Sequence, residues 1–70
     1  MEQEMQQQLD EIKIQLQEEA KNYPLMRRRM NANEKGLVYC ANRVIHMMKF
    51  ENCDFSGACA WLESELEGMD

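Results

Sequence analysis

The residues with the most specific chemistry in this chain are one histidine and three cysteines, spaced C-x5-H-x6-C-x5-C: Cys40, His46, Cys53 and Cys59. Structural zinc sites usually take their ligands in close pairs, with about two to four residues between the members of a pair. No such pair occurs in the sequence, and cysteine is often buried simply as a small hydrophobic residue. We therefore predict that these residues bind no metal and that the protein uses no cofactor.

Nucleophilic catalysis needs a serine or cysteine beside His46, with a third group to orient the imidazole. The serines are Ser56 and Ser64, and no glycine-rich loop that would hold phosphate follows a predicted strand. Enzyme pockets commonly measure about 300–1,000 Å³, and we expect three short helices to enclose no space of that size. The sequence thus predicts a protein that is not an enzyme and has no catalytic residues.

The basic cluster Arg27, Arg28 and Arg29 is a candidate for partner binding, because the guanidinium fork suits phosphate and carboxylate groups. On a helix, three consecutive residues fan over roughly 200°, so all three cannot face one groove. Nucleic-acid affinity comes mainly from phosphate neutralisation, whereas both ends of this chain are acidic. Binding of a partner protein is therefore favoured over DNA or RNA binding through this cluster, which is the first alternative. The second alternative is that the arginines pair with glutamates of neighbouring helices.

Trp61 is a second candidate for partner binding. It lies one step off the apolar stripe of its predicted helix, next to Leu62. A half-exposed tryptophan on a small domain is a typical hot-spot residue. The alternative is that its indole covers the edge of the core.

Helices must position these side chains, because helix formers dominate the composition and no alternating apolar run predicts a strand. The first helix is predicted from about Glu2 to Asn22, and Pro24 ends it. Its apolar residues form a narrow a/d seam: Met5, Leu9, Ile12 and Leu16. Such a seam is typical of a coiled-coil surface between chains, and we predict that it binds a second copy or another partner. The alternative is packing inside one three-helix bundle.

The middle of the chain predicts a helix from about Ala32 to Lys49, preceded by a short helix that opens with Pro24. Asn31 and Glu34 have the spacing of a capping box. Gly36 is either tolerated there or permits a close approach of two backbones. One uninterrupted helix from Pro24 to Lys49 is the alternative.

The last helix is predicted to begin after Asp54, a good N-cap residue, and to end at Gly68, a typical C′ residue. The apolar stripes of the second and third helices predict the core: Leu37, Ala41, Val44, Met48, Phe55, Cys59, Leu62 and Leu66. We therefore expect residues 1–70 to form a single all-α domain. It has three helices, a long first helix followed by a packed pair, and it can pair into a helical dimer.

Charge is divided into blocks along the chain. Residues 1–22 carry six acids and two bases (net −4), residues 23–49 six bases and one acid (net +5), and residues 50–70 six acids (net −6). This order favours mutual attraction of neighbouring helices. It also suits an acidic surface that blocks a basic, nucleic-acid-binding site on a partner.

An odd number of cysteines favours reduced thiols, and hence the cytoplasm. The acidic, Gln-rich start does not resemble a leader peptide, and no apolar run is long enough for a membrane span. A chain of 70 residues has a core worth roughly 3–5 kcal/mol, which favours homodimerisation. We predict a small acidic regulator, inhibitor or adaptor that binds a partner protein, with a subunit of a larger helical assembly as a further alternative.

Overall fold

A computed structural model describes residues 2–69, with side chains described from Gln6 onward; the predicted seam residue Met5 lies outside the described side chains. Four helices and one short 3-10 turn follow one another: α1 (Glu2–Glu19), η1 (Ala20–Asn22), α2 (Pro24–Ala32), α3 (Glu34–Phe50) and α4 (Phe55–Met69). The predicted all-α class is confirmed. The described chain contains four helices rather than three, because the short segment opened by Pro24 is a helix of its own.

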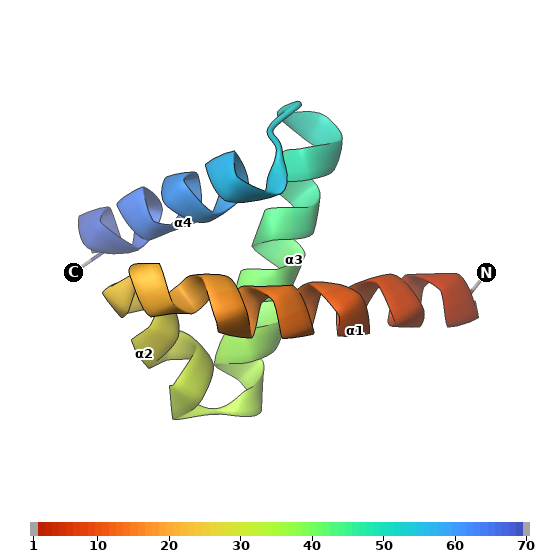
Figure 1. Cartoon of the computed structure of the whole chain (residues 1–70), viewed down its shortest axis with the longest axis horizontal. Helices are drawn as coiled ribbons and strands as arrows, with labels where there is room; N and C mark the ends of the chain where they lie inside the picture. The colour runs from red at the N-terminus through yellow and green to blue at the C-terminus, as the bar shows by residue number, and fades with distance from the viewer. Residues whose placement is uncertain (1, 70) are drawn as a thin grey trace.

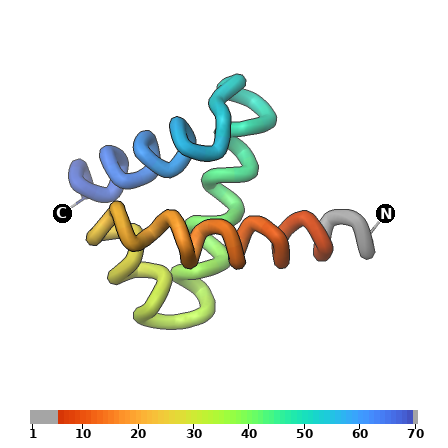
Figure 2. Tube along the Cα trace, viewed as in Figure 1, coloured from red at the N-terminus to blue at the C-terminus, as the bar shows by residue number. Residues whose placement is uncertain are grey.

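The longer helices are arranged around α3, which contacts each of the other three (Figure 1). α1 crosses α3, and η1, which follows α1, lies beside α2 (Figure 2). α4 turns back from the end of α3 and packs against α2 as well. This arrangement brings three helices, α2, α3 and α4, together at one end of the molecule.

Pro24 separates the first two helices, as its type predicts. Tyr23 adopts an extended conformation (φ −133°), which is the preference of a residue that precedes proline. Pro24 then occupies the first turn of α2, where its missing N–H costs no hydrogen bond. Tyr23 is the N-cap residue of α2, but its side chain makes no capping hydrogen bond. The N–H groups of this helix must therefore find another acceptor.

A second break, at Asn33, separates α2 from α3. Asn33 is extended, and its Oδ1 accepts a hydrogen bond from the N–H of Gly36 at 2.8 Å. The predicted cap at Asn31 is wrong, since Asn31 lies inside α2, and so is the single helix over residues 24–49. Asn33 is the cap because it is extended at the break between the two helices, where its side-chain oxygen meets the free N–H of Gly36.

The start of α4 is as predicted and its end is not. Asp54 Oδ1 accepts a hydrogen bond from the N–H of Gly57 at 2.7 Å, so the predicted N-cap is confirmed. Before it, Asn52 takes the left-handed conformation (φ 56°) that ends α3. The predicted stop at Gly68 is wrong, because α4 continues to Met69 and Gly68 has no positive φ.

The core runs through all four helices. Its buried apolar residues are Ile12, Leu16, Ala20, Met26, Met30, Cys40, Ala41, Val44, Met47, Ala58, Cys59, Leu62 and Leu66. Of the predicted core residues outside this set, Leu37, Met48 and Phe55 are half-buried and pack against it. The sequence pattern missed Met26 and Met30, which bring α2 into the core.

The predicted seam on α1 faces the inside of this single chain. Ile12 is 7% exposed and Leu16 is fully buried, while Leu9 is half-buried against the core. The coiled-coil interpretation requires these residues to be exposed to a second chain, but within this single chain Ile12 and Leu16 are already buried. The stripe is narrow because α1 crosses α3 and buries only one side. Among the helices described between residues 2 and 69, none combines the length and the hydropathy needed to cross a bilayer.

Candidate functional site

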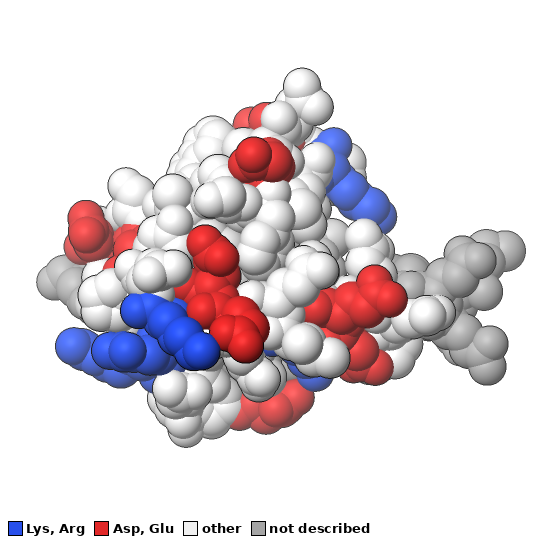
Figure 3. Space-filling model, in the orientation of Figure 1, with Lys and Arg blue, Asp and Glu red and all other residues white. Residues whose placement is uncertain are grey.

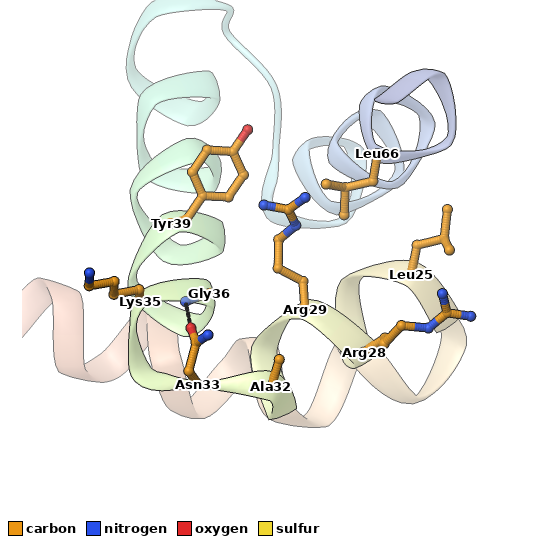
Figure 4. Close-up of a pocket in the computed structure, with 9 residues that line it drawn as sticks. All are labelled: Leu25, Arg28, Arg29, Ala32, Asn33, Lys35, Gly36, Tyr39 and Leu66. Carbon is orange, nitrogen blue, oxygen red and sulfur yellow. Dashed lines mark hydrogen bonds between the residues drawn. The ribbon is translucent and has the colours of Figure 1, made fainter. Parts of the chain in front are cut away.

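An open pocket of about 630 Å³ lies where α2, α3 and α4 meet (Figure 4). Its lining comes from α2, from the break after it, from the start of α3 and from one residue of α4: Leu25, Arg28, Arg29, Ala32, Asn33, Lys35, Gly36, Tyr39 and Leu66. It is an open surface pocket rather than an enclosed cavity, so the expectation that short helices enclose no space of this size is not contradicted. The pocket exists because the chain folds back at Asn33 and α4 closes the third side.

Close contact between α2 and α3 forms one wall of the pocket. A Cβ atom added at Gly36 would lie 2.1 Å from the carbonyl oxygen of Arg29, which is far inside van der Waals contact. Glycine is therefore required for the two backbones to meet, and the predicted close approach at Gly36 is confirmed. This contact sets the distance between Arg29 on one helix and Tyr39 on the other.

Glu63 of α4 holds the start of α2. Its carboxylate accepts hydrogen bonds from the N–H of Leu25 (Oε2, 2.9 Å) and the N–H of Met26 (Oε1, 2.9 Å). The side chain is in the interior, with Glu63 only 8% exposed. A carboxylate at a helix N-terminus satisfies free N–H groups and opposes the positive end of the helix dipole. Glu63 thus replaces the side-chain cap that Tyr23 does not provide.

Sequence reasoning did not single out Glu63, although two signals pointed to it. It falls four residues after Cys59 and three before Leu66, on the apolar face of the last helix. An acid on such a face needs a buried partner. The helix that opens with Pro24 has no capping residue of its own, so its N–H groups were the natural donors.

Three cations line the pocket, and Tyr39 fixes one of them. The guanidinium carbon of Arg29 lies 5.2 Å from the centre of the Tyr39 ring, a cation–π contact. In Figure 4 the Arg29 guanidinium points into the space between Tyr39 and Leu66, whereas Arg28 and Lys35 extend outward from opposite walls. Arg29 is half-buried, and the other two cations are exposed.

Among the side chains described from Gln6 onward, none forms an ion pair with these three cations. The ion pairs of that part of the chain use other bases: Lys13 with Glu34, Lys21 with Glu18, and Arg43 with Glu65. On the face shown in Figure 3, most of the basic surface gathers at the end that holds α2, next to acidic side chains. With three cations and no acidic side chain in its lining, the pocket is a local positive site on a protein of net charge −5.

The predicted arginine cluster is split by the helix, as its spacing predicts. Arg28 and Arg29 line the pocket, and Arg27 is exposed outside its lining. Lys35 and Tyr39, which complete the site, come from the next helix. No pattern within the sequence linked them to the arginines.

Trp61 lies outside the pocket lining, on the exposed surface of α4. It is 46% exposed. Four residues further along the same helix, Glu65 accepts hydrogen bonds from Arg43 Nη2 at 2.9 and 3.1 Å. Phe50, at the end of α3, is 70% exposed and stacks against His46 with ring centres 4.8 Å apart. Trp61 remains a separate candidate for partner contact.

The cysteines are positioned as structural residues. Cys40 and Cys59 are buried, and Cys53 is half-buried. Burial raises the pKa of the Cys40 thiol to about 11 and that of the Cys59 thiol to about 12. Both thiols are therefore protonated and unreactive near neutral pH. Within the described residues, no group of three or more His, Cys, Asp or Glu side chains is placed to hold a metal ion.

Comparison of the chain with protein-family models, with curated proteins and with solved structures found no match. The chemistry of the pocket is therefore the basis for a functional proposal.

Proposed function

We propose that this protein is a non-enzymatic module that binds a partner protein, and that the basic pocket is the binding site. The observation that carries the proposal is the presence of Arg28, Arg29 and Lys35, none of them in an ion pair with a described side chain, in the lining of one partly apolar pocket. Unpaired cations around apolar surface favour a ligand that brings both negative charge and apolar atoms.

The lining supports binding rather than catalysis. It contains no carboxylate, imidazole or thiol, and its other groups that could act as base or nucleophile are Lys35, which is exposed, and Tyr39, whose ring contacts Arg29. The thiols of Cys40 and Cys59 are buried and have raised pKa values. A regulator or adaptor needs no such groups, because its action depends on affinity alone.

A protein partner suits the site better than a nucleic acid. Affinity for DNA grows with the number of phosphates neutralised, and this pocket offers three cations. A folded partner that presents a few charges in one place needs no long basic track. Its binding would be sensitive to salt, since the cations at Arg28 and Lys35 are exposed.

Capture experiments with matched variants test the proposal. The tagged protein is used to capture proteins from a lysate of its own host, with and without nuclease, alongside Arg28→Glu and Arg27→Glu. We expect a protein that is retained after nuclease treatment, lost with Arg28→Glu and kept with Arg27→Glu, because Arg28 lines the pocket and Arg27 does not. Capture that ends with nuclease, or that responds equally to both substitutions, would refute the pocket as a protein-binding site.

A further inference from the structure

We infer that the pocket recognises an acidic peptide segment whose apolar side chain is flanked by carboxylates. This inference rests on the proposed function and names the partner chemistry of the same site. The apolar side chain packs on Leu25 and Leu66. The flanking carboxylates bind the arginines of α2 and the lysine of α3.

Part of the inner surface of the pocket is apolar. Leu66 is only 3% exposed and Leu25 is half-buried, so each offers an edge of the core rather than a free side chain. Ala32 and Gly36 add surface without polar side-chain atoms. A small inorganic anion would leave this surface wet, whereas an aliphatic side chain would cover it.

The cations occupy three different places around this apolar surface. Arg29 points between Tyr39 and Leu66, at the centre, while Arg28 and Lys35 extend from opposite walls (Figure 4). A ligand with several negative groups can meet cations in all three places. A segment with an acid on each side of an apolar residue fits this distribution.

Tyr39 prepares Arg29 for an oxyanion. The contact at 5.2 Å holds the guanidinium near the ring, so less side-chain freedom is lost when a carboxylate binds its N–H groups. Asn33, the N-cap residue of α3, and Lys35 and Gly36 of its first turn also line the pocket, so the positive end of this 17-residue helix lies beside it, partly offset by the carboxylate of Glu34 in the same turn. The cation–π contact and the helix end favour a carboxylate beside the apolar side chain.

An acidic segment already packs on α2 in this chain. α4 contacts α2, and the carboxylate of Glu63 accepts hydrogen bonds from two N–H groups of α2. Glu63 uses backbone N–H groups of α2, so the arginine side chains of α2 are left for a second acidic segment. Charge complementarity thus selects an acidic peptide.

The test is a titration of the isotope-labelled full chain, followed by NMR, with the peptide acetyl-Glu-Glu-Leu-Glu-Glu-amide. Two matched peptides replace the four glutamates by glutamine, or the leucine by alanine. We expect saturable shifts of the backbone signals of Arg29, Gly36 and Tyr39. The glutamine and alanine peptides should each bind at least about fivefold more weakly, the worth of one partly exposed charge pair or a few buried methylenes.

Variants locate the binding. Arg28→Gln should weaken the acidic peptide about fivefold, and Arg27→Gln, with the same loss of charge outside the pocket, should leave it unchanged. Because Arg28 is exposed, its substitution leaves the fold intact. Equal effects of the two variants would show general charge attraction and would overturn the inference.

Three further outcomes also decide. Shifts away from the pocket, equal binding of the glutamine peptide, or tighter binding of a single-stranded oligonucleotide at Arg29 and Gly36 would each refute an acidic peptide as the ligand. A host protein whose capture depends on Arg28, together with no preference for the acidic peptide, would refute this inference and leave the proposed function standing. If the capture of a host protein does not depend on Arg28 and the acidic peptide is not preferred either, the proposed function is refuted as well.

Discussion

The buried carboxylate of Glu63 offers the sharpest test of how the pocket is built. It accepts two hydrogen bonds, from the N–H groups of Leu25 and Met26, at 2.9 Å each. No side chain caps α2 from within its own sequence, since Tyr23 makes no capping hydrogen bond and Pro24 has no N–H. Replacement of Glu63 therefore leaves the N–H groups of Leu25 and Met26 without their acceptor and lowers the free energy of unfolding.

The expected loss follows from these contacts. A hydrogen bond to a charged group contributes about 1.5–3 kcal/mol. In Glu63→Gln the amide oxygen still accepts one N–H, but the NH₂ group faces the other donor and the charge at the helix N-terminus is gone, so we expect a loss of about 2 kcal/mol. Glu63→Ala removes both bonds and should cost about 3–4 kcal/mol. The total free energy of unfolding of a 70-residue domain is about 3.5–10 kcal/mol, so either loss is a large part of it.

Urea unfolding followed by far-UV circular dichroism and by the fluorescence of Trp61 measures this loss. With a slope of about 1 kcal/mol per molar urea for a protein of this size, Glu63→Gln should lower the midpoint by about 2 M. The control is Glu67→Gln, the same change at an exposed position of α4, which should stay within about 0.5 kcal/mol of wild type. Equal midpoints for the two variants would show that Glu63 does not hold α2, and the reasoning would fail.

Three further predictions concern the packing around the site. Gly36→Ala should lose more than about 2 kcal/mol in urea unfolding, because its Cβ would meet a backbone carbonyl at 2.1 Å, whereas Gly68→Ala, with open space around it, should gain up to about 1 kcal/mol; a gain at both would contradict the helix contact. Leu16→Glu should unfold the chain in circular dichroism, at a cost above about 4 kcal/mol, because the side chain is fully buried; a folded monomer formed from a wild-type dimer would instead support the coiled-coil seam. The free energy of unfolding should fall as pH rises from about 9 to about 11, because burial raises the pKa of Cys40 from 9.0 to about 11 and that of Cys59 from 9.0 to about 12. The unfolded chain therefore loses these thiol protons at lower pH than the folded chain does. The variant with alanine at both positions should show a shallower fall, and an identical fall would reject this cause.

Local signals in the sequence were sufficient for the helix class and for several boundaries. Pro24 restricts the residue before it wherever it stands, and Asp54 needs only its own next turn to act as a cap. Asn31 and Asn33 both have capping chemistry, and the choice between them depends on where α2 and α3 meet. That contact, at Gly36, is tertiary, so spacing alone selected the wrong asparagine.

The function of a helix face was harder to predict than its existence. The narrow stripe that includes Leu9 and Leu16 is typical of a coiled coil, but a helix that crosses one partner inside a globule also buries a narrow stripe. The period of the stripe is the same in both cases. Its partner is set by the fold of the remaining chain, which the stripe itself does not encode.

The pocket was out of reach because its members are distant in sequence. Arg29 belonged to a visible cluster, but Tyr39 comes from the next helix and Leu66 from the last. The fold brings them together through the break at Asn33 and through Glu63. Only the arginines carried a local signal, and that signal did not distinguish Arg27 from its two neighbours in the site.

The central claim is that the partner binds at the basic pocket, and mapping the bound partner on the protein tests it most directly. The measurement is an NMR spectrum of the isotope-labelled chain with and without the captured partner protein. The account predicts that signals of Arg29, Gly36 and Tyr39 shift or broaden first, and that those signals stay in place when Arg28→Glu is used. Changes confined to the indole of Trp61 and its neighbours on α4, with the pocket signals unmoved, would contradict it.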